Sequence, residues 1–110
     1  MYVRIARFEG VDPGTVDQQL QGIREEIAEG RRRAEAGELE RLEQEGMSAL
    51  QRAIFAVDRE GGRTASLTFA ADEEGIMKVH AWMNSMSPGA GGGQRASVEI
   101  YEVAIDEQAG

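Results

Sequence analysis

The sequence contains no cysteine, which excludes disulfides, thiolate metal sites and cysteine nucleophiles and suits a reducing compartment. It also lacks any apolar run near the ~20 residues that a transmembrane helix needs. The N-terminal segment MYVRIARFEG has no long apolar stretch of the kind that secretory signals carry. We therefore expect a cytoplasmic protein that does not bind membranes.

Basic residues are in the minority, with 12 Lys and Arg against 20 Asp and Glu, and the formal net charge is −8. An acidic surface repels phosphate backbones, so nucleic acid is not an expected partner. Histidine is almost missing as well: His80 is the single one, and the carboxylates show no metal-ligand spacing. The sequence therefore predicts no metal site.

A chain of 110 residues is long enough for one domain with one core. We predict a single domain over residues 1–105 and a frayed tail over residues 106–110.

The clearest pattern in the chain is a hairpin over residues 48–70, SALQRAIFAVDREGGRTASLTFA. Apolar residues alternate in both halves, and a period of two predicts strands. Asp58, Gly61 and Gly62 supply turn chemistry between them. The expected faces are Ala53, Phe55 and Val57 opposite Leu50, Ile54 and Ala56 in the first strand, and Ala65, Leu67 and Phe69 opposite Thr64, Ser66 and Thr68 in the second.

A helix is expected between a first strand over residues 2–9 and this hairpin. Thr15 with Gln18 forms a capping-box pattern at its start. We expect the helix to reach about residue 36, a break at Gly37, and a short helix over residues 38–45, with one long bent helix as the alternative. Acidic residues surround Arg31–Arg33, which favours a solvated helix face over an anion-binding patch. The apolar stripe of the long helix is Val16, Leu20, Ile23 and Ile27.

A second long helix follows the hairpin, with Asp72 as its expected cap and Ser87-Pro88 as its stop. The glycine-rich loop at residues 89–93 leads to a last strand over residues 95–105. A phosphate-binding glycine loop follows a strand and opens a helix, so this loop is not one. The expected buried side of the helix is Ile76, Val79, Met83 and Met86.

This order of strand, helix, strand, strand, helix and strand predicts an α+β, ferredoxin-like βαββαβ fold. Right-handed crossovers place the helices on one face of a four-stranded antiparallel sheet, in the spatial order second, third, first, fourth. The strands carry apolar residues on both faces, and a large apolar face left in water is unfavourable. We therefore expect a homodimer in which two sheets pack face to face.

Four segments of the chain resemble the dimeric α+β barrel superfamily, and within it the small proteins related to antibiotic biosynthesis monooxygenases. The segments are residues 2–10 (YVRIARFEG), 54–61 (IFAVDREG), 67–74 (LTFAADEE) and 97–103 (SVEIYEV). The resemblance implies a pocket in each monomer between the sheet and the helices. It also implies oxidation of an aromatic or polyketide-like substrate by molecular oxygen, with no metal, flavin or other cofactor.

Within such a pocket His80 is the candidate catalytic residue, acting as a base on a phenolic proton. Either Arg4 or Arg7 is a candidate for binding an acidic or enolate group of the ligand, and Arg7 is the one placed in the pocket. Phe69 stands where the resemblance implies a pocket aromatic, and Trp82 and Met83 offer soft, adaptable walls.

Each of these candidates also has a purely structural interpretation. His80 fits a half-exposed helix position, and Trp82 and Met83 fit ordinary packing. Arg4 and Arg7 are expected either to pair with Glu99 or Glu102 or to reach solvent at the rim.

Three functions follow: a cofactor-independent monooxygenase, a non-catalytic dimer that binds an apolar or aromatic small molecule, and haem binding through His80. The first two fit the sequence better. Haem-degrading relatives carry an Asn on the first strand and a Trp at the end of the third, whereas this chain has no Asn in its first strand and has Phe69 in the other place.

Overall fold

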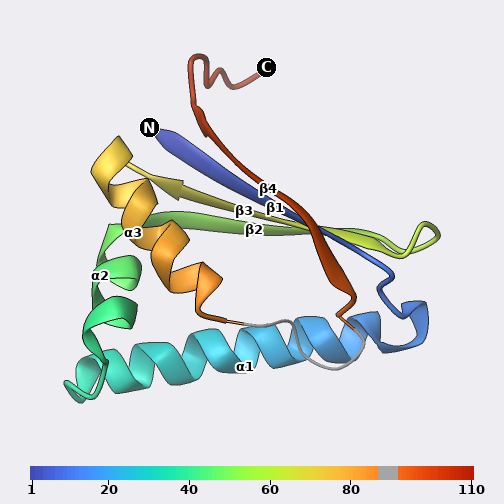
Figure 1. Cartoon of the computed structure of the whole chain (residues 1–110), viewed down its shortest axis with the longest axis horizontal. Coiled ribbons are helices and arrows are strands. Elements are labelled where there is room, and N and C mark those ends of the chain that lie inside the picture. The colour runs from blue at the N-terminus through green and yellow to red at the C-terminus, as the bar shows by residue number, and fades with distance from the viewer. Residues whose placement is uncertain (87–91) are drawn as a thin grey trace.

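The computed structural model describes residues 1–86 and 92–110, with strands and helices in the predicted order (Figure 1). The strands form one antiparallel sheet of four, in the predicted order β2-β3-β1-β4. The α+β, ferredoxin-like fold is therefore confirmed. The elements are β1 (Tyr2–Glu9), η1 (Pro13–Thr15, a 3-10 turn), α1 (Val16–Glu35), α2 (Arg41–Ala49), β2 (Leu50–Asp58), β3 (Arg63–Ala70), α3 (Glu73–Asn84) and β4 (Gln94–Glu102).

All three α-helices lie on one side of the sheet (Figure 1). We call the side of the sheet toward the helices the inner face and the opposite side the outer face. Directly paired residues share a face, so Arg4 lies on the inner face with Thr68 and Ile100, and Val3 lies on the outer face with Phe69 and Tyr101.

The predicted faces hold for most of the hairpin, but Leu50 is an exception. The pairing of β2 with β3 shifts between Leu50 and Arg52, so Leu50 pairs with Ala70 on the inner face and packs against the core. An extra residue in one strand reverses the alternation beyond it. The strand also begins at Leu50 and not at Ser48, because α2 continues through Ala49.

The core lies where α3 crosses the inner face. Ile76 and Val79 are fully buried against Ala70. The predicted cap is present: the Asp72 carboxylate accepts a hydrogen bond from the Gly75 amide at 2.7 Å. Met86 is 46% exposed, so the buried side of α3 ends before it.

The connection from α1 to α2 confirms the predicted break and corrects its surroundings. Gly37 has a φ of 71°, a left-handed conformation that glycine adopts without a steric penalty. The second helix begins at Arg41 and not at residue 38. At the start of α1, the side chain of Thr15 makes no capping hydrogen bond to the helix backbone. Its hydroxyl accepts a hydrogen bond from the Gln19 side-chain amide at 2.7 Å, so the predicted capping box with Gln18 is wrong.

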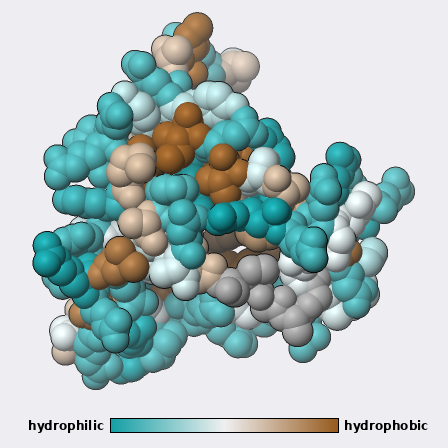
Figure 2. Space-filling view, in the orientation of Figure 1, coloured by the Kyte–Doolittle hydropathy of each residue, from teal (hydrophilic) through white to brown (hydrophobic). Residues whose placement is uncertain are grey.

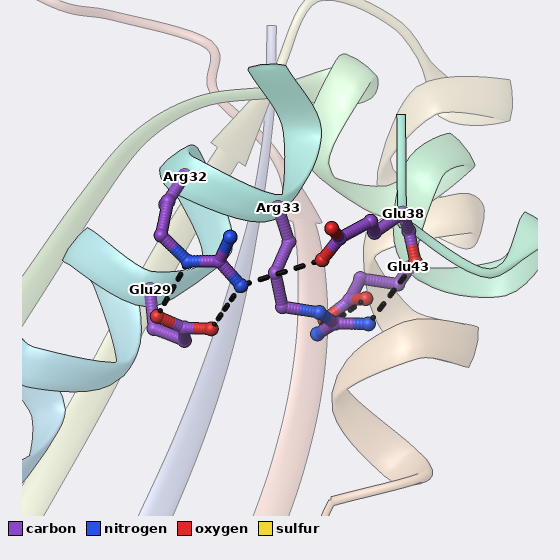
Figure 3. Close-up of polar contacts among 5 residues, drawn as sticks. All are labelled: Glu29, Arg32, Arg33, Glu38 and Glu43. Atoms are coloured by element: carbon purple, nitrogen blue, oxygen red, sulfur yellow. Dashed lines mark hydrogen bonds and ion pairs between the residues drawn. The ribbon is translucent and has the colours of Figure 1, made fainter. Parts of the chain in front are cut away.

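Two arginines of the predicted Arg31–Arg33 triple hold α1 to the chain that follows it (Figure 3). Arg32 lies 2.7 Å from Glu29 and 3.3 Å from Glu38. Arg33 lies 3.0 Å from Glu43 of α2. Because carboxylates of the chain itself pair with Arg32 and Arg33, these two arginines do not form an anion-binding patch.

Two expectations at the end of α3 lie outside the described residues: the stop at Ser87-Pro88 and the loop over residues 89–91. β4 ends at Glu102, before the predicted residue 105, and the Val103 amide donates to the Met1 carbonyl at 2.9 Å. None of the helices in the described ranges is long and apolar enough to span a bilayer.

Candidate functional site

An arginine is buried at the centre of the inner face. Arg4 is 3% exposed and lies on β1, between Thr68 of β3 and Ile100 of β4. Strand alternation turns Arg4 to the same side as its neighbour Ala6, which is 2% exposed. The guanidinium therefore extends toward α3 and not toward solvent.

Hydrogen-bond partners for Arg4 come from one side of α3. Its Nε donates to His80 Nδ1 at 3.0 Å, and its Nη2 donates to Asn84 Oδ1 at 3.3 Å. Residues four apart share a helix face, which brings His80 and Asn84 to the same guanidinium. Arg95, near the start of β4, donates through Nη1 to the same Asn84 oxygen at 2.6 Å. We call these four residues the arginine–histidine cluster.

The hydrogen bonds of the cluster fix the proton of a neutral His80. Its Nδ1 accepts from Arg4, and a neutral imidazole has one acceptor nitrogen, so the proton lies on Nε2. That nitrogen is 3.1 Å from Asn84 Nδ2, which is also a donor. Turning the amide over would direct its N–H groups at Arg4 and Arg95, so the Asn84 oxygen stays with the arginines. The Nε2–H of His80 is therefore left without an acceptor in the described ranges.

The charges in the cluster are all positive. Burial, with the positive charges of Arg4 and Arg95, lowers the pKa of His80 below its usual 6.5. Burial and the charge of Arg95 also lower the pKa of Arg4, although a guanidinium stays protonated in proteins. At neutral pH the cluster holds two guanidinium charges and an uncharged imidazole.

Over residues 1–86 and 92–110, neither Arg4 nor Arg95 has a carboxylate within ion-pair distance. A buried cation is costly unless it is paired. Thr68, which pairs with Arg4 across the sheet, adds a fully buried hydroxyl that has no hydrogen-bond partner among the described residues. The site thus holds more positive charge and more unused polar groups than its described neighbours satisfy.

A hollow lies between the sheet and α1 (Figures 1 and 2). The helix is anchored by Val16, which is 2% exposed, but farther along the same stripe Ile27 is 40% exposed. Phe55, on the inner face of β2, is 39% exposed. At the Arg95 end there is a surface depression of about 370 Å³, lined in part by Glu9. Ile27 on α1 and Phe55 on β2 are therefore apolar side chains that the described chain covers incompletely.

The predicted site residues do not share one cavity. His80 belongs to the cluster on the inner side. Arg7 and Phe69 lie on the outer face, across the sheet from His80. Arg7 forms the ion pair considered for it, with Nη1 2.5 Å from the Glu99 carboxylate.

Trp82 and Met83 lie within the packing of the helix layer. A Cβ atom at Gly46 of α2 would lie 2.6 Å from Trp82 Cβ, so the two helices meet at this point. Met83 packs against the buried core of α3 and β3. The hydrogen-bond partners of His80 are Arg4 and Asn84, and neither Trp82 nor Met83 is among those partners in the described ranges.

Sequence reasoning gave Arg4 the wrong partners. Of the alternatives for Arg4, the pairing with Glu99 or Glu102 and the solvent position are wrong, because Arg4 is buried against His80 and Asn84. Binding of an acidic ligand group by Arg4 stays a prediction. The feature of the sequence that indicates this burial is strand alternation, which turns Arg4 to the same side of β1 as the apolar Ala6. No comparable signal marks Arg95, since a register shift between Arg7 and Phe8 decides where it pairs.

No group of three or more His, Asp or Glu side chains that could hold a metal ion occurs in the part of the chain that the structure describes. Comparisons with protein-family models, with curated proteins and with solved structures found no match to this chain. The fold therefore follows from the structure alone, and a relationship to the antibiotic biosynthesis monooxygenases stays a prediction from the sequence.

Proposed function

We propose that this protein binds a small apolar or aromatic molecule in the hollow between α1 and the inner face of the sheet. The observation that carries the proposal is a pair of apolar side chains left incompletely covered, with Ile27 40% and Phe55 39% exposed. A domain of this size normally closes such space with side chains, because buried apolar area is its main source of stability. A ligand that fills the hollow gains the same contacts.

The neutral fluorescent probe N-phenyl-1-naphthylamine tests this proposal. We expect its emission to rise on mixing with the protein and to saturate. Ile23 lies on the α1 stripe that faces the sheet, so Ile23→Gln should weaken binding about fivefold or more, since a buried apolar side chain contributes about 1.5–3 kcal/mol.

Glu25→Gln, on the exposed side of the same helix, is the matched control and should change nothing. Absence of saturable emission in the parent protein contradicts the proposal. The proposal is also contradicted if Phe69→Ser weakens probe binding and Ile23→Gln does not, because Phe69 lies on the outer face.

The proposal includes a second copy of the chain on the outer face. Val3, Ile5, Leu67 and Phe69 are paired neighbours there, and the described helices α1, α2 and α3 all lie on the other side of the sheet. A two-fold axis lets one apolar face cover its equivalent. Size-exclusion chromatography with light scattering should give twice the 12.0 kDa chain mass. Leu67→Lys should shift it to the monomer; a monomeric parent protein at micromolar concentration contradicts the dimer.

Oxidation of the bound molecule is a second candidate, favoured by His80 beside two guanidiniums. His80 takes a phenolic proton at Nδ1 once the Arg4 Nε–H turns from this nitrogen to the forming phenolate, because Nε2 already carries a proton. Arg4 and Arg95 then stabilise the resulting anion. The anion supplies electrons to molecular oxygen, so an activated CH₂ group becomes a carbonyl and one water is released. This reaction is the one that the resemblance to the antibiotic biosynthesis monooxygenases implies.

Oxygen uptake with anthrone as substrate tests the reaction. We expect uptake above buffer in the parent protein and a loss of most of it in His80→Asn, which keeps an acceptor for Arg4 but cannot act as the base. Equal uptake by both proteins removes His80 from the reaction. Haem binding through His80 gains no support from the geometry, because both ring nitrogens already lie within 3.1 Å of protein nitrogens.

A further inference from the structure

We propose that Arg4 and Arg95 bind a singly charged anionic group of the ligand, a carboxylate or phenolate carried by its aromatic body. This inference rests on the proposed function and names the class of molecule that the hollow takes.

Arg4 lacks a counter-charge among the described residues. Arg4 is 3% exposed, and in the described chain it faces an imidazole and an amide but no carboxylate. Elsewhere on this acidic protein, arginines such as Arg7, Arg33 and Arg63 pair with carboxylates. A buried guanidinium beside a second cation is favoured when an anion completes the set.

The guanidiniums of Arg4 and Arg95 reach one point. Arg4 Nη2 and Arg95 Nη1 donate to the same oxygen, Asn84 Oδ1, at 3.3 and 2.6 Å. An uncharged amide oxygen therefore occupies the place where a charged oxygen would bind more strongly. Asn84 is the last residue of α3 and is exposed, so its side chain can turn away without disturbing the core.

The cluster also holds hydrogen-bond donors that its own residues do not use. Guanidinium groups carry five N–H donors, and Arg4 spends two of them on His80 and Asn84. The Nε2–H of His80 faces the Asn84 amide nitrogen and has no acceptor there. An anion that replaces the Asn84 side chain accepts from Arg4, Arg95 and His80 together, and all three then have a partner.

The surroundings select the kind of anion. The chain has a net charge of −8, which opposes the approach of highly charged anions such as nucleotides. Ile27 on α1 and Phe55 on the inner face are apolar and incompletely covered. A monoanion on an aromatic body matches both features, whereas a free inorganic anion fills no part of the hollow.

Two probes of equal shape test the inference: 2-naphthoate, which carries a carboxylate, and 2-naphthalenemethanol, which is neutral. Each displaces N-phenyl-1-naphthylamine in a competition titration. We expect naphthoate to bind about tenfold or more tightly than the alcohol, because a hydrogen bond to a charged group contributes more than a neutral one. Raising sodium chloride from about 50 mM to about 500 mM should weaken naphthoate alone.

Arg95 is exposed, so Arg95→Gln leaves the core intact and should remove most of the preference for naphthoate while the alcohol binds as before. Arg41→Gln, at an arginine whose side chain is 91% exposed on α2, is the control and should change neither affinity. Equal affinity of the two probes in the parent protein overturns the inference and leaves the proposed function standing. An equal loss of both affinities in Arg95→Gln also overturns it. If neither probe binds, the proposed function fails and this inference fails with it.

Discussion

Replacing Gly46 with alanine measures how closely α2 and α3 pack. Gly46 is buried inside α2, and a Cβ atom placed there would lie 2.6, 2.7 and 2.9 Å from Trp82 Cβ, Cε3 and Cδ2. Real Cβ atoms do not approach other carbons so closely, so the indole or the helix must move. Overpacking of this kind costs about 1–3 kcal/mol.

Gly46→Ala also raises helix propensity, which favours the folded state, and a matched control measures this contribution separately. Alanine is better than glycine inside a helix by about 1 kcal/mol. Gly22 is inside α1, where a Cβ atom would meet nothing within 4 Å. Gly22→Ala should therefore stabilise the protein by about 1 kcal/mol. Because helix propensity is common to both variants, Gly46→Ala should be less stable than Gly22→Ala by about 1–3 kcal/mol.

Urea unfolding followed by Trp82 fluorescence gives both free energies, since Trp82 is the single tryptophan of the chain. The emission maximum of folded Gly46→Ala should also shift, because the indole leaves its contact with α2. Equal stabilisation by the two substitutions would refute the close packing at Trp82. That result would also make Trp82 more available as a ligand wall than the structure indicates.

Three further predictions concern pH, the core and the ion pairs. The pKa of His80 is lower in the folded protein than in the unfolded chain, so the unfolded chain binds a proton first as the pH falls. The contribution of His80 to stability should therefore be full above about pH 6.5 and decline below it. His80→Asn should lose this decline, which urea unfolding from about pH 8 to pH 5 measures. Ile76→Ala, at a fully buried position, should lower the free energy of unfolding by about 2–5 kcal/mol. Ile105→Ala, at a residue that is 80% exposed, should lower it by less than about 0.5 kcal/mol, and similar losses in the two variants would contradict the assigned core. The side chains of Arg33 and Glu43 are 30% and 24% exposed, so a double-mutant cycle should give a coupling free energy below about 1 kcal/mol that weakens as salt is added. A coupling free energy that salt leaves unchanged would contradict a solvent-screened ion pair.

Much of the fold could be predicted because its signals are local. A period of two marked β1 and β3, a period near four marked α1 and α3, and Gly37 marked the break between helices. Connection handedness then gave the sheet order. The predicted start of β2 was wrong because α2 continues through Ala49, and helix formers without a cap leave such a boundary open.

The candidate site was harder to predict, because its members come together only through packing. The side chains of Arg4 and His80 meet across 76 positions, and those of Arg4 and Asn84 across 80. Sequence reasoning found His80 because it is the single imidazole. It grouped His80 with Arg7 and Phe69, and strand alternation places those two on the opposite face.

The sequence by itself determined the order of the elements, the sheet topology and the acidic balance of the surface, since these follow from periodicity, connection rules and composition. Only the tertiary structure decided which cation is buried and what it meets. Arg4 and Arg7 sit three positions apart on β1, so the alternation of a strand sends them to opposite faces. Once α3 crosses the inner face, Arg4 is enclosed against His80 and Asn84 while Arg7 stays in reach of Glu99 and solvent.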